Sequence, residues 1–456
     1  MRLGQYPSYR PNNIEWLPVL PDAWQHIRAR FVLSVNPSPA KSRELDDSAE
    51  VSFVPMEAVG EYGGLSLDRT KLLDEVGSGD TEVEDGDVVV AKITPCFENG
   101  KGALANGLVN GVAFGTTELH VLRAGKLLDR RFLFYLTMSH TFRALGESEM
   151  YGAGGQKRVP PEFVKDFRVP LPPLSDQQCI VRFLDAQTAR IDSLVAKKQD
   201  LIEKLKEKRS ALIARTVTRG LPTEAAGKVG LNPDPEMMNS GVDWLGEVAR
   251  HWQVKPLKRV AHIGNGSTPA RDNADYWEDG VFPWLNSSVV NLEEVTEAVE
   301  LVTATALRMC HLPKIQPPAV LVGITGEGRT RGMATTLKLD ATINQHIAFI
   351  KPMATRAEAG YLRRVMDRAY QFLRSESEGG GSTKGAITCD QIANMKVPVP
   401  PLAEQRAIVA YLDGETLRLD ALTRKVEAAI THLAEYRQAL ITSAVTGKID
   451  LREAVT

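Results

Sequence analysis

The chain has 456 residues, of which 43% are hydrophobic, so it exceeds one ordinary domain and can bury two or more cores. Its formal net charge is only -2, so any surface that binds nucleic acid must be a local basic patch. The sequence contains neither a signal peptide nor a run of about 20 apolar residues, so we expect a cytoplasmic protein without a membrane span.

The first half of the chain is predicted to be a mixed domain of strands and helices. It opens with Trp16 and Trp24. Short β-branched and aliphatic runs predict strands at 88–90 and 121–122, between glycine-rich turns. A short helix is expected near 129–140, after the second of these strands.

A pair of prolines at 172–173 marks the joint between this domain and a long helix. Proline cannot extend a strand ladder and is well placed just before or at a helix start. Ser175 and Gln178 predict a capping box at that start. The second half has Ala403 and Glu404 instead, which loses the cap oxygen but keeps an acidic group at the positive end of the helix dipole.

The second half repeats the first. Its tryptophans, Trp244 and Trp252, lie 228 positions after those of the first half. At the same offset, 50 positions from Val169–Thr218 align without a gap with Val397–Thr446, and 24 of them are identical. Because the segments between these ends diverge, the halves are expected to share a fold but not a surface.

The intervening part of the second half also shows the pattern of the first. A strand is predicted at 320–322 and a helix at 357–373. Both halves are therefore predicted to be mixed domains of strands and helices, each followed by a long helix.

The long helices carry an apolar residue at every seventh position, which is typical of a coiled coil. Helices of about 42 residues would be roughly 60 Å long, and their apolar seams would be exposed to water unless the helices paired. Because one helix follows each of two similar halves related by a pseudo-twofold axis, antiparallel pairing is predicted. The seam residues are Leu184, Ile191, Leu205 and Leu212 in the first helix and Leu412, Leu419, Val426, Leu433 and Leu440 in the second. The predicted complementary positions are Ile180, Leu194 and Leu201, and Ile408, Leu422 and Ala429.

No catalytic motif is present. The sequence lacks G-x-x-x-x-G-K-[ST], H-E-x-x-H and G-x-S-x-G. In GITGEGRTR, Arg331 replaces the third glycine of a dinucleotide fingerprint, which favours a hairpin tip. Four widely spaced cysteines and eight single histidines predict no metal site. We therefore expect no catalytic residue, metal or cofactor in this chain.

Glycine-spaced loops instead gather polar and basic side chains. Arg, Lys, Asn and Gln match base edges, and the amides of glycine can approach phosphates closely. Taken singly, a residue of this kind is more often part of a solvated turn than a DNA contact. The DNA-binding candidates are Lys92, Asn99, Lys101, Tyr151, Gln156, Lys157 and Arg158 in the first half and Arg329, Arg331, Ser382, Thr383 and Lys384 in the second.

These features together resemble the specificity subunit of type I restriction-modification systems, over essentially the whole chain. The resemblance is carried by VPLPPLSDQQCIVRFLDAQTARIDSL, by its second copy VPVPPLAEQRAIVAYLDGETLRLDAL, and by GDVVVAKITPCFENGKGAL with FGTTELHVLR. It implies two target-recognition domains that each read one half of a split, asymmetric DNA site. It also implies that the paired helices set the gap between half-sites and hold the modification subunits.

The predicted fold class is α+β, with two homologous mixed α/β target-recognition domains separated by two long helices that pair as an antiparallel coiled coil about a pseudo-twofold axis. The predicted boundaries are 1–168 and 223–396 for the domains and 169–222 and 397–456 for the helices. The resemblance implies double-stranded DNA, methyltransferase subunits and a restriction or translocase subunit as partners.

On the same grounds, S-adenosylmethionine and ATP are expected on the partner chains. Two other classes of protein are alternatives. One is a coiled-coil scaffold without DNA function, for which the variable loops are unexpected. The other is a single-chain restriction enzyme, for which two repeats leave no room in 456 residues.

Overall fold

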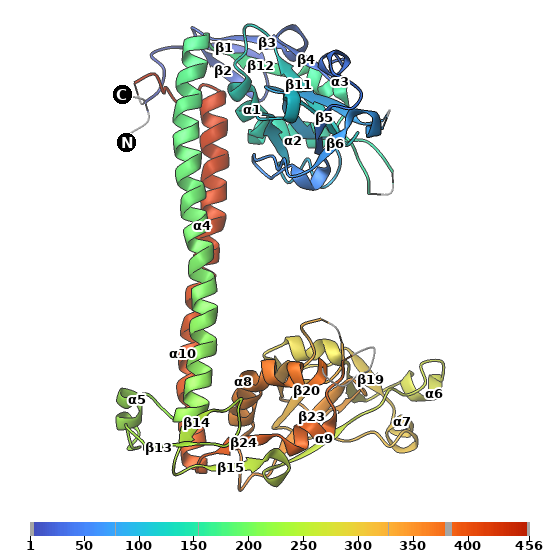
Figure 1. The fold of residues 1–456 in the computed structure, drawn as a ribbon, viewed down its shortest axis with the longest axis vertical. Helices are drawn as coiled ribbons and strands as arrows, with labels where there is room; N and C mark the ends of the chain where they lie inside the picture. The colour runs from blue at the N-terminus through green and yellow to red at the C-terminus, as the bar shows by residue number, and fades with distance from the viewer. Residues whose placement is uncertain (1–3, 78, 154, 327, 379–384, 454–456) are drawn as a thin grey trace. The chain divides into compact units, whose positions relative to one another are not determined.

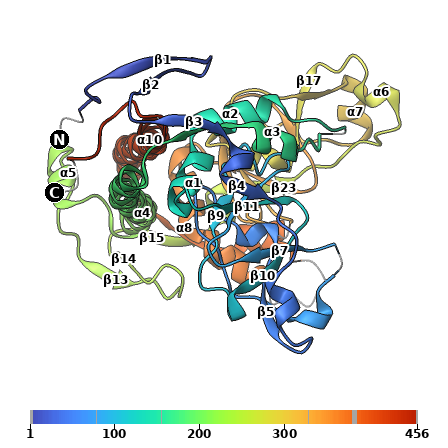
Figure 2. The ribbon, with the colours of Figure 1, turned by 90° about the horizontal axis from the view of Figure 1, so that it is seen from above.

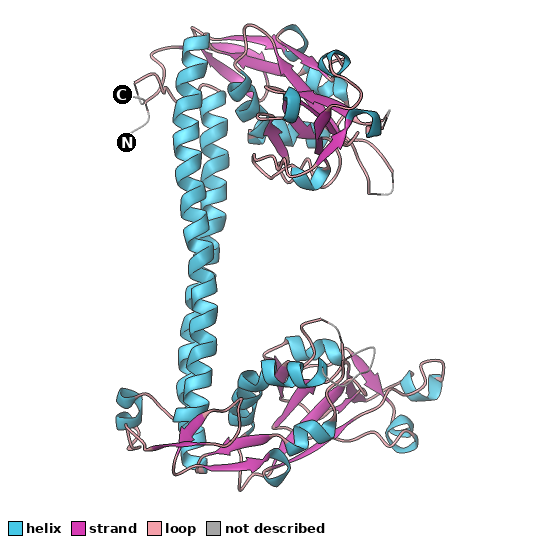
Figure 3. Cartoon of the chain, in the orientation of Figure 1, coloured by secondary structure: helices cyan, strands magenta, loops and turns pink. Residues whose placement is uncertain are grey.

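The computed structural model describes residues 4–77, 79–153, 155–326, 328–378 and 385–453. The chain divides into two compact units. The first unit is Met1–Gln199 with Glu427–Thr456, and the second is Asp200–Val426. Each unit combines strands and short helices, called here its sheet domain, with parts of two long helices (Figure 3). No helix among the described residues is long and apolar enough to cross a lipid bilayer.

The sheet domain of the first unit contains two four-stranded sheets, in the orders β6-β5-β10-β7 and β4-β11-β8-β9. Two further two-stranded sheets, β1-β2 and β12-β3, complete it (Figure 1). Its strands are β1 Tyr9–Ile14, β2 Leu17–Pro21, β3 Gln25–Arg28, β4 Leu33–Val35, β5 Glu50–Val54, β6 Thr70–Leu72, β7 Thr81–Glu84, β8 Val88–Ala91, β9 Gly102–Leu104, β10 Val112–Gly115, β11 Leu119–Ala124 and β12 Arg168–Leu171. Its helices are α1 Arg130–Met138, α2 His140–Ser148 and α3 Pro161–Asp166.

The predicted strands at 88–90 and 121–122 are confirmed as β8 and β11, which pair antiparallel. The helix expected near 129–140 is present as α1, and α2 follows it after a break. Asp129 caps α1 by accepting hydrogen bonds from the amides of Arg131 and Phe132. Ser139 is the C-cap residue of α1 and the N-cap residue of α2. Its hydroxyl accepts a hydrogen bond from the amide of Phe142 in α2.

The sheet domain of the second unit contains a five-stranded sheet, β16-β23-β20-β21-β18, and a three-stranded sheet, β19-β17-β22. The remaining strands pair as β13-β14 and β15-β24. Its strands are β13 Met237–Asn239, β14 Glu247–Ala249, β15 Gln253–Pro256, β16 Ala261–Asn265, β17 Phe282–Leu285, β18 Glu294–Val295, β19 Glu300–Val302, β20 Ala319–Gly323, β21 Ala334–Leu337, β22 Thr342–Ile343, β23 Ile347–Pro352 and β24 Lys396–Val399. Its helices are α5 Thr223–Lys228, α6 Ala274–Trp277, α7 Ala304–Met309, α8 Ala359–Glu378 and α9 Cys389–Asn394.

The sequence repeat is also a repeat of strand register. Gln25 pairs with Leu171 where β3 meets β12, and Gln253 pairs with Val399 where β15 meets β24. Both residues of the second pair lie 228 positions after those of the first. The order β4-β11-β8-β9 in one unit likewise matches β16-β23-β20-β21 in the other. The predicted common fold is therefore confirmed, although the segments between the matched ends differ in sequence.

The long helices are α4, Leu174–Arg219, and α10, Leu402–Val445, and they lie side by side in both views (Figures 1 and 2). In the first unit, Arg437 of α10 forms an ion pair of 2.7 Å with Asp192 of α4. In the second unit, Arg209 of α4 approaches Asp420 of α10 at 3.5 Å. The residue number rises from 192 to 209 along α4 while that of its partner on α10 falls from 437 to 420. The pairing is therefore antiparallel, as predicted.

The predicted seam residues are buried, apart from Leu212 and Leu433, which are half-buried. Their side chains also meet the sheet domains. Leu184, for example, belongs to one apolar cluster that includes Leu440 and the aromatic side chain of Phe132 on α1. Each helix therefore divides its apolar surface between the other helix and a sheet domain.

Part of the prediction for the complementary positions is wrong. Leu194, Leu201 and Leu422 are 40–47% exposed. The neighbouring Ile202 is buried in place of Leu201. The physical reason is that an α-helix drifts by about 20° per heptad relative to a strict seven-residue repeat, so a single seam cannot stay in contact while the helix also faces a domain.

The predicted capping box at Ser175 is also wrong. Helix α4 begins at Leu174, so Ser175 lies inside its first turn and its hydroxyl contacts Asp176. The carbonyl of Pro173 accepts the first amide hydrogen bonds, from Asp176 and Gln177. The helix thus starts two residues earlier than a cap at Ser175 would place it.

Replacing Leu412 by alanine removes a fully buried side chain from the core of the second unit, and we expect it to lower the free energy of unfolding by about 2–5 kcal/mol. Leu422→Ala is the matched control on the same helix, because Leu422 is 43% exposed, and its effect should be below about 1 kcal/mol. Urea titrations followed by circular dichroism measure both changes. Equal losses would contradict the assignment of Leu412 to the core.

Candidate nucleic-acid interface

Two loops of the first unit that carry DNA-binding candidates lie against each other. One follows β8 and contains Lys92, and the other contains residues 151–153 and 155–158. The amide of Val159 donates to the carbonyl of Lys92 at 2.8 Å, and the amide of Thr94 donates to the carbonyl of Lys157 at 3.0 Å. The backbone therefore brings residues that are far apart in sequence to one edge of the sheet domain.

The candidate side chains at this edge fall into two groups. Asn99, Tyr151, Gln156 and Lys157 are exposed, and Tyr151 retains 67% of its accessible surface. These side chains are available to a ligand.

The second group already has partners within the protein. The ammonium of Lys101 donates to the carbonyl of Met56 at 3.0 Å. Arg158 donates to both carboxylate oxygens of Glu118, at 2.9 and 2.7 Å, which lowers the pKa of that carboxyl. Lys92 is half-buried beside the same carboxylate. For these three residues a contact with DNA would compete with the interaction that each already makes inside the protein. Their role in DNA binding stays a prediction.

A buried arginine that the sequence did not single out holds the loop 97–101 in place. Arg143 of α2 donates to the carbonyls of Phe97 at 2.9 Å, Lys101 at 3.4 Å and Thr137 at 2.8 Å. Its guanidinium also lies 4.8 Å from the ring centroid of Phe97, and burial lowers its pKa. Because Arg143 binds the backbone of the loop, the side chain of Asn99 does not have to anchor it.

His120 on β11 anchors the other loop. Its Nε2 donates to the carbonyl of Val159 at 2.9 Å, and its Nδ1 accepts from the side-chain amide of Asn36 at 3.3 Å. This pattern requires the neutral imidazole, and burial lowers the pKa of His120 accordingly.

The second unit repeats the loop arrangement after β20. The amide of Ile387 donates to the carbonyl of Ile324 at 2.8 Å, as Val159 does to Lys92. Ile387 lies 228 positions after Val159. The candidates Ser382, Thr383 and Lys384 belong to the loop that returns to this point, but they lie outside the described residues, and their role stays a prediction.

The two arginine candidates of the second unit differ in their surroundings. Arg329 is exposed. The side chain of Arg331 is only 5% exposed and forms an ion pair of 2.9 Å with Glu378. Arg374 of α8 donates to the carbonyl of Gly328 at 2.7 Å, and the hydroxyl of Tyr370 donates to that of Arg329 at 3.0 Å. An arginine from the following helix thus holds this loop through its backbone, as Arg143 does in the first unit.

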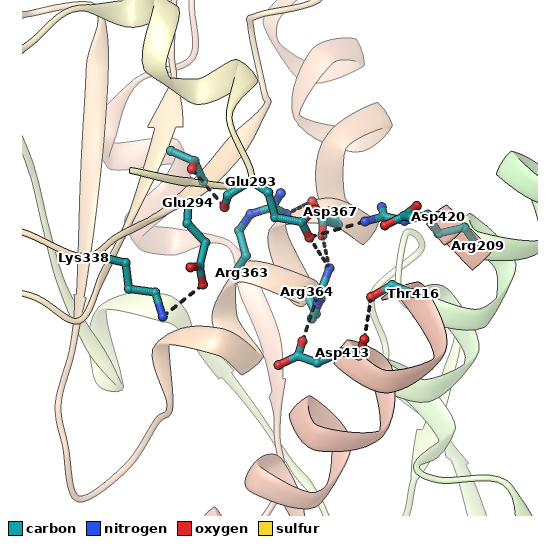
Figure 4. A network of polar contacts seen from close by, with 11 residues as sticks. Arg209, Glu293, Glu294, Lys338, Arg363, Arg364, Asp367, Asp413, Thr416 and Asp420 are labelled. Atoms are coloured by element: carbon teal, nitrogen blue, oxygen red, sulfur yellow. Dashed lines mark hydrogen bonds and ion pairs between the residues drawn. The ribbon is translucent and has the colours of Figure 1, made fainter. Parts of the chain in front are cut away.

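An ion-pair network connects the sheet domain of the second unit to the long helices (Figure 4). Arg364 of α8 lies 2.8 Å from Asp413 of α10 and 3.6 Å from Glu293. Glu293 also lies 3.4 Å from Arg209 of α4, which approaches Asp420. In the first unit the corresponding contact joins Arg131 of α1 to Asp185 of α4 at 2.8 Å. Among the described residues, no group of three or more His, Cys, Asp or Glu side chains is placed to hold a metal ion.

Comparison with known proteins gives a consistent result. A family model described as the type I restriction modification DNA specificity domain matches residues 32–204 and 249–432. The chain is 41% identical over 167 residues to the EcoAI specificity subunit of Escherichia coli, covering 36% of this chain and 28% of that protein. It is 40% identical over 179 residues to the EcoEI specificity subunit of the same organism, covering 39% and 30%. The chain therefore matches less than a third of the length of these two relatives.

Solved structures match over more of the chain. The HsdS subunit from Thermoanaerobacter tengcongensis has a TM-score of 0.55 at 21% identity, covering 94% of this chain and 98% of that one. A chain from a structural study of complex assembly in the type I R-M system has a TM-score of 0.70 at 21% identity, covering 93% and 98%. At this identity the likeness supports the fold.

Replacing Arg143 by methionine should leave three buried carbonyls without their donor. We expect the first unit to lose about 1–3 kcal/mol of unfolding free energy and the loop 97–101 to become more sensitive to proteolysis. Arg130→Met, at an exposed position of α1, is the control and should behave as the unmodified protein. Limited proteolysis with mass spectrometry locates the cuts. Unchanged cutting in the Arg143 variant would contradict the anchoring role.

A pH dependence follows from His120. Because burial lowers its pKa below the ordinary value of 6.5, the unfolded chain binds the proton more readily, so stability present above about pH 6.5 is lost as the pH falls. We expect the unfolding temperature of the first unit to drop between pH 7 and pH 5. In a His120→Gln variant the drop should be smaller, as differential scanning calorimetry would measure. An equal drop in both proteins would rule out His120 as its source.

Proposed function

The chain belongs to the type I restriction modification DNA specificity family, and we propose on this premise that it reads DNA sequence for a larger restriction-modification complex. The observation that carries the proposal is the repeated sheet domain, with matched strand register but different exposed side chains at the loop edge. Two such readers suit a split DNA site, one half for each.

The exposed loop side chains differ between the two units, which predicts that the two half-sites differ in base sequence. The first unit presents Asn99, Gln156 and Lys157, whose donors and acceptors can pair with base edges, whereas the second presents Arg329. Phosphate contacts give most of the affinity for DNA, and base contacts give the specificity. Since the net charge of the chain is -2, we propose that partner subunits supply much of the charge that meets the phosphates.

We propose that these partners are methyltransferase subunits, together with a restriction or translocase subunit that joins through the complex. In this proposal S-adenosylmethionine and ATP bind to the partners, and the chain itself contributes recognition and spacing rather than chemistry. Its relatives are specificity subunits by name, which favours recognition over the scaffold alternative. The paired helices α4 and α10 are proposed to set the gap between half-sites, close to one turn of the duplex, about 34 Å.

Replacing residues 223–396 by the corresponding segment of another family member should change one half of the recognised site only. The other half and the spacer should stay as they were, because the first unit and the helices are untouched. Sequencing of methylated bases in the genome of a host that carries the complex measures the site directly.

The matched control replaces residues 1–168 and should change the other half-site. If both half-sites changed together in either chimera, the two units would not read independently. A scaffold without DNA function would show no sequence preference for duplex at any salt concentration, whereas a reader retains one.

A further inference from the structure

We infer that one buried glutamine in each unit, Gln177 in the first and Gln405 in the second, is a positioning residue that sets the angle between the sheet domain and its long helix. Both side chains are fully buried near the start of α4 and α10, respectively. The consequence for DNA described below rests on the proposed function, but the structural part does not.

Gln177 joins three segments of the first unit. Its Oε1 accepts from the amide of Asp129 at 2.7 Å, and its Nε2 donates to the carbonyls of Leu127 at 3.0 Å and Pro172 at 2.9 Å. Leu127 and Asp129 precede α1 of the sheet domain, and Pro172 follows its last strand. The helix, the strand exit and the start of α1 are thus fixed to one amide group.

Gln405 makes the same three contacts in the second unit. Its Oε1 accepts from the amide of Glu358 at 2.9 Å, and its Nε2 donates to the carbonyls of Arg356 at 3.0 Å and Pro400 at 2.8 Å. Gln405 and Pro400 lie 228 positions after Gln177 and Pro172. Because the domain-side segments differ in sequence but are bound through the backbone, the contact is independent of which sheet domain is attached.

Only an amide side chain meets this set of partners. Glutamine offers an acceptor oxygen and two donor hydrogens in one plane, and here all are used. A glutamate would have no hydrogen to donate to the two carbonyls, and an apolar residue would leave a buried amide and two buried carbonyls without partners.

The other contacts at this junction constrain direction less. Ile180 and Leu184 in the first unit, and Leu412 in the second, bury apolar surface, which favours contact without fixing an angle. In the second unit, the carboxylate of Asp413 that pairs with Arg364 (Figure 4) is exposed to water, which weakens the ion pair. Hydrogen bonds depend on both distance and angle. The first unit has a further one, from the hydroxyl of Tyr135 on α1 to the carboxylate of Asp185 on α4 at 2.6 Å. The buried glutamine is the directional contact that recurs at the same position in both units.

In the proposed function this angle determines where each sheet domain meets the duplex. Loosening it should let a unit reach half-sites at neighbouring spacings. The discrimination between correct and incorrect spacers should then weaken, while the bases preferred in each half-site stay the same.

The test uses the full chain assembled with its modification subunits and the variants Gln177→Met and Gln405→Met, which keep the length of the side chain and remove its hydrogen bonds. Gln178→Met, at the exposed neighbouring position, is the matched control. Binding is measured for duplexes with the native spacer and with one base pair added or removed. We expect the preference for the native spacer to fall about tenfold in the glutamine variants and not in the control. A uniform loss at all three spacers, or no change, would overturn the positioning role.

Hydrogen exchange tests the junction without DNA. The amides of Asp129 and Glu358 should exchange faster in Gln177→Met and Gln405→Met, respectively, and normally in Gln178→Met. Unchanged exchange would overturn the inference whatever the DNA result. Faster exchange together with no sequence preference in the unmodified complex would instead refute the proposed function. If a methionine variant does not fold, Gln177→Asn or Gln405→Asn takes its place, because the shorter amide cannot reach all three partners.

Discussion

The joining of a long helix to a sheet domain at a few buried positions underlies all other properties of this protein. Gln177, Ile180 and Leu184 follow one another at helical spacing, so they present one face of α4 to the first sheet domain. Ile408 and Leu412 repeat this face on α10, beside Gln405. The apolar members supply most of the contact area, and the amide gives it direction. Without this joint the helices would carry domains whose orientation was undefined.

Within each sheet domain, the strand pairing next to the long helix is the same in both units, whereas the loops differ. The pairing of β3 with β12 recurs in β15 with β24 at the same register, which holds the ends of each domain next to its helix. The loops between these ends differ, and arginines on the following helices grip them by backbone carbonyls. Such an arrangement lets the surface change while the frame beneath it stays the same, which is what two readers of unlike sequences require.

Periodic features were predictable from the sequence because they depend on spacing alone. The repeat, the two long helices, their antiparallel pairing and the strands β8 and β11 were all predicted correctly. The predicted cap at Ser175 failed because the start of a helix depends on which residue enters helical geometry first, here Leu174. The exposure of Leu194 and Leu422 could not be foreseen from a heptad pattern, since it depends on how each helix turns toward its domain.

The site was less accessible to sequence reasoning, because it is assembled from long-range contacts. Nothing in the local sequence indicates that Lys101 and Arg158 find partners inside the protein. Gln177 and Arg143 carried no motif of their own either. For glutamine a signal did exist, since Gln177 and Gln405 are among the identical positions of the repeat, and a buried polar residue kept in both copies points to a bonded role.

The hydrogen bonds from Arg143 and Arg374 to backbone carbonyl oxygens affect how such a protein can evolve. A carbonyl is present whatever side chain a residue bears, so substitutions in the loops 97–101 and 328–331 leave these anchors available. Single amino-acid replacements can then alter the chemistry offered to a ligand with little penalty in folding. Mutational robustness at the loop backbone thus becomes a source of new binding preferences.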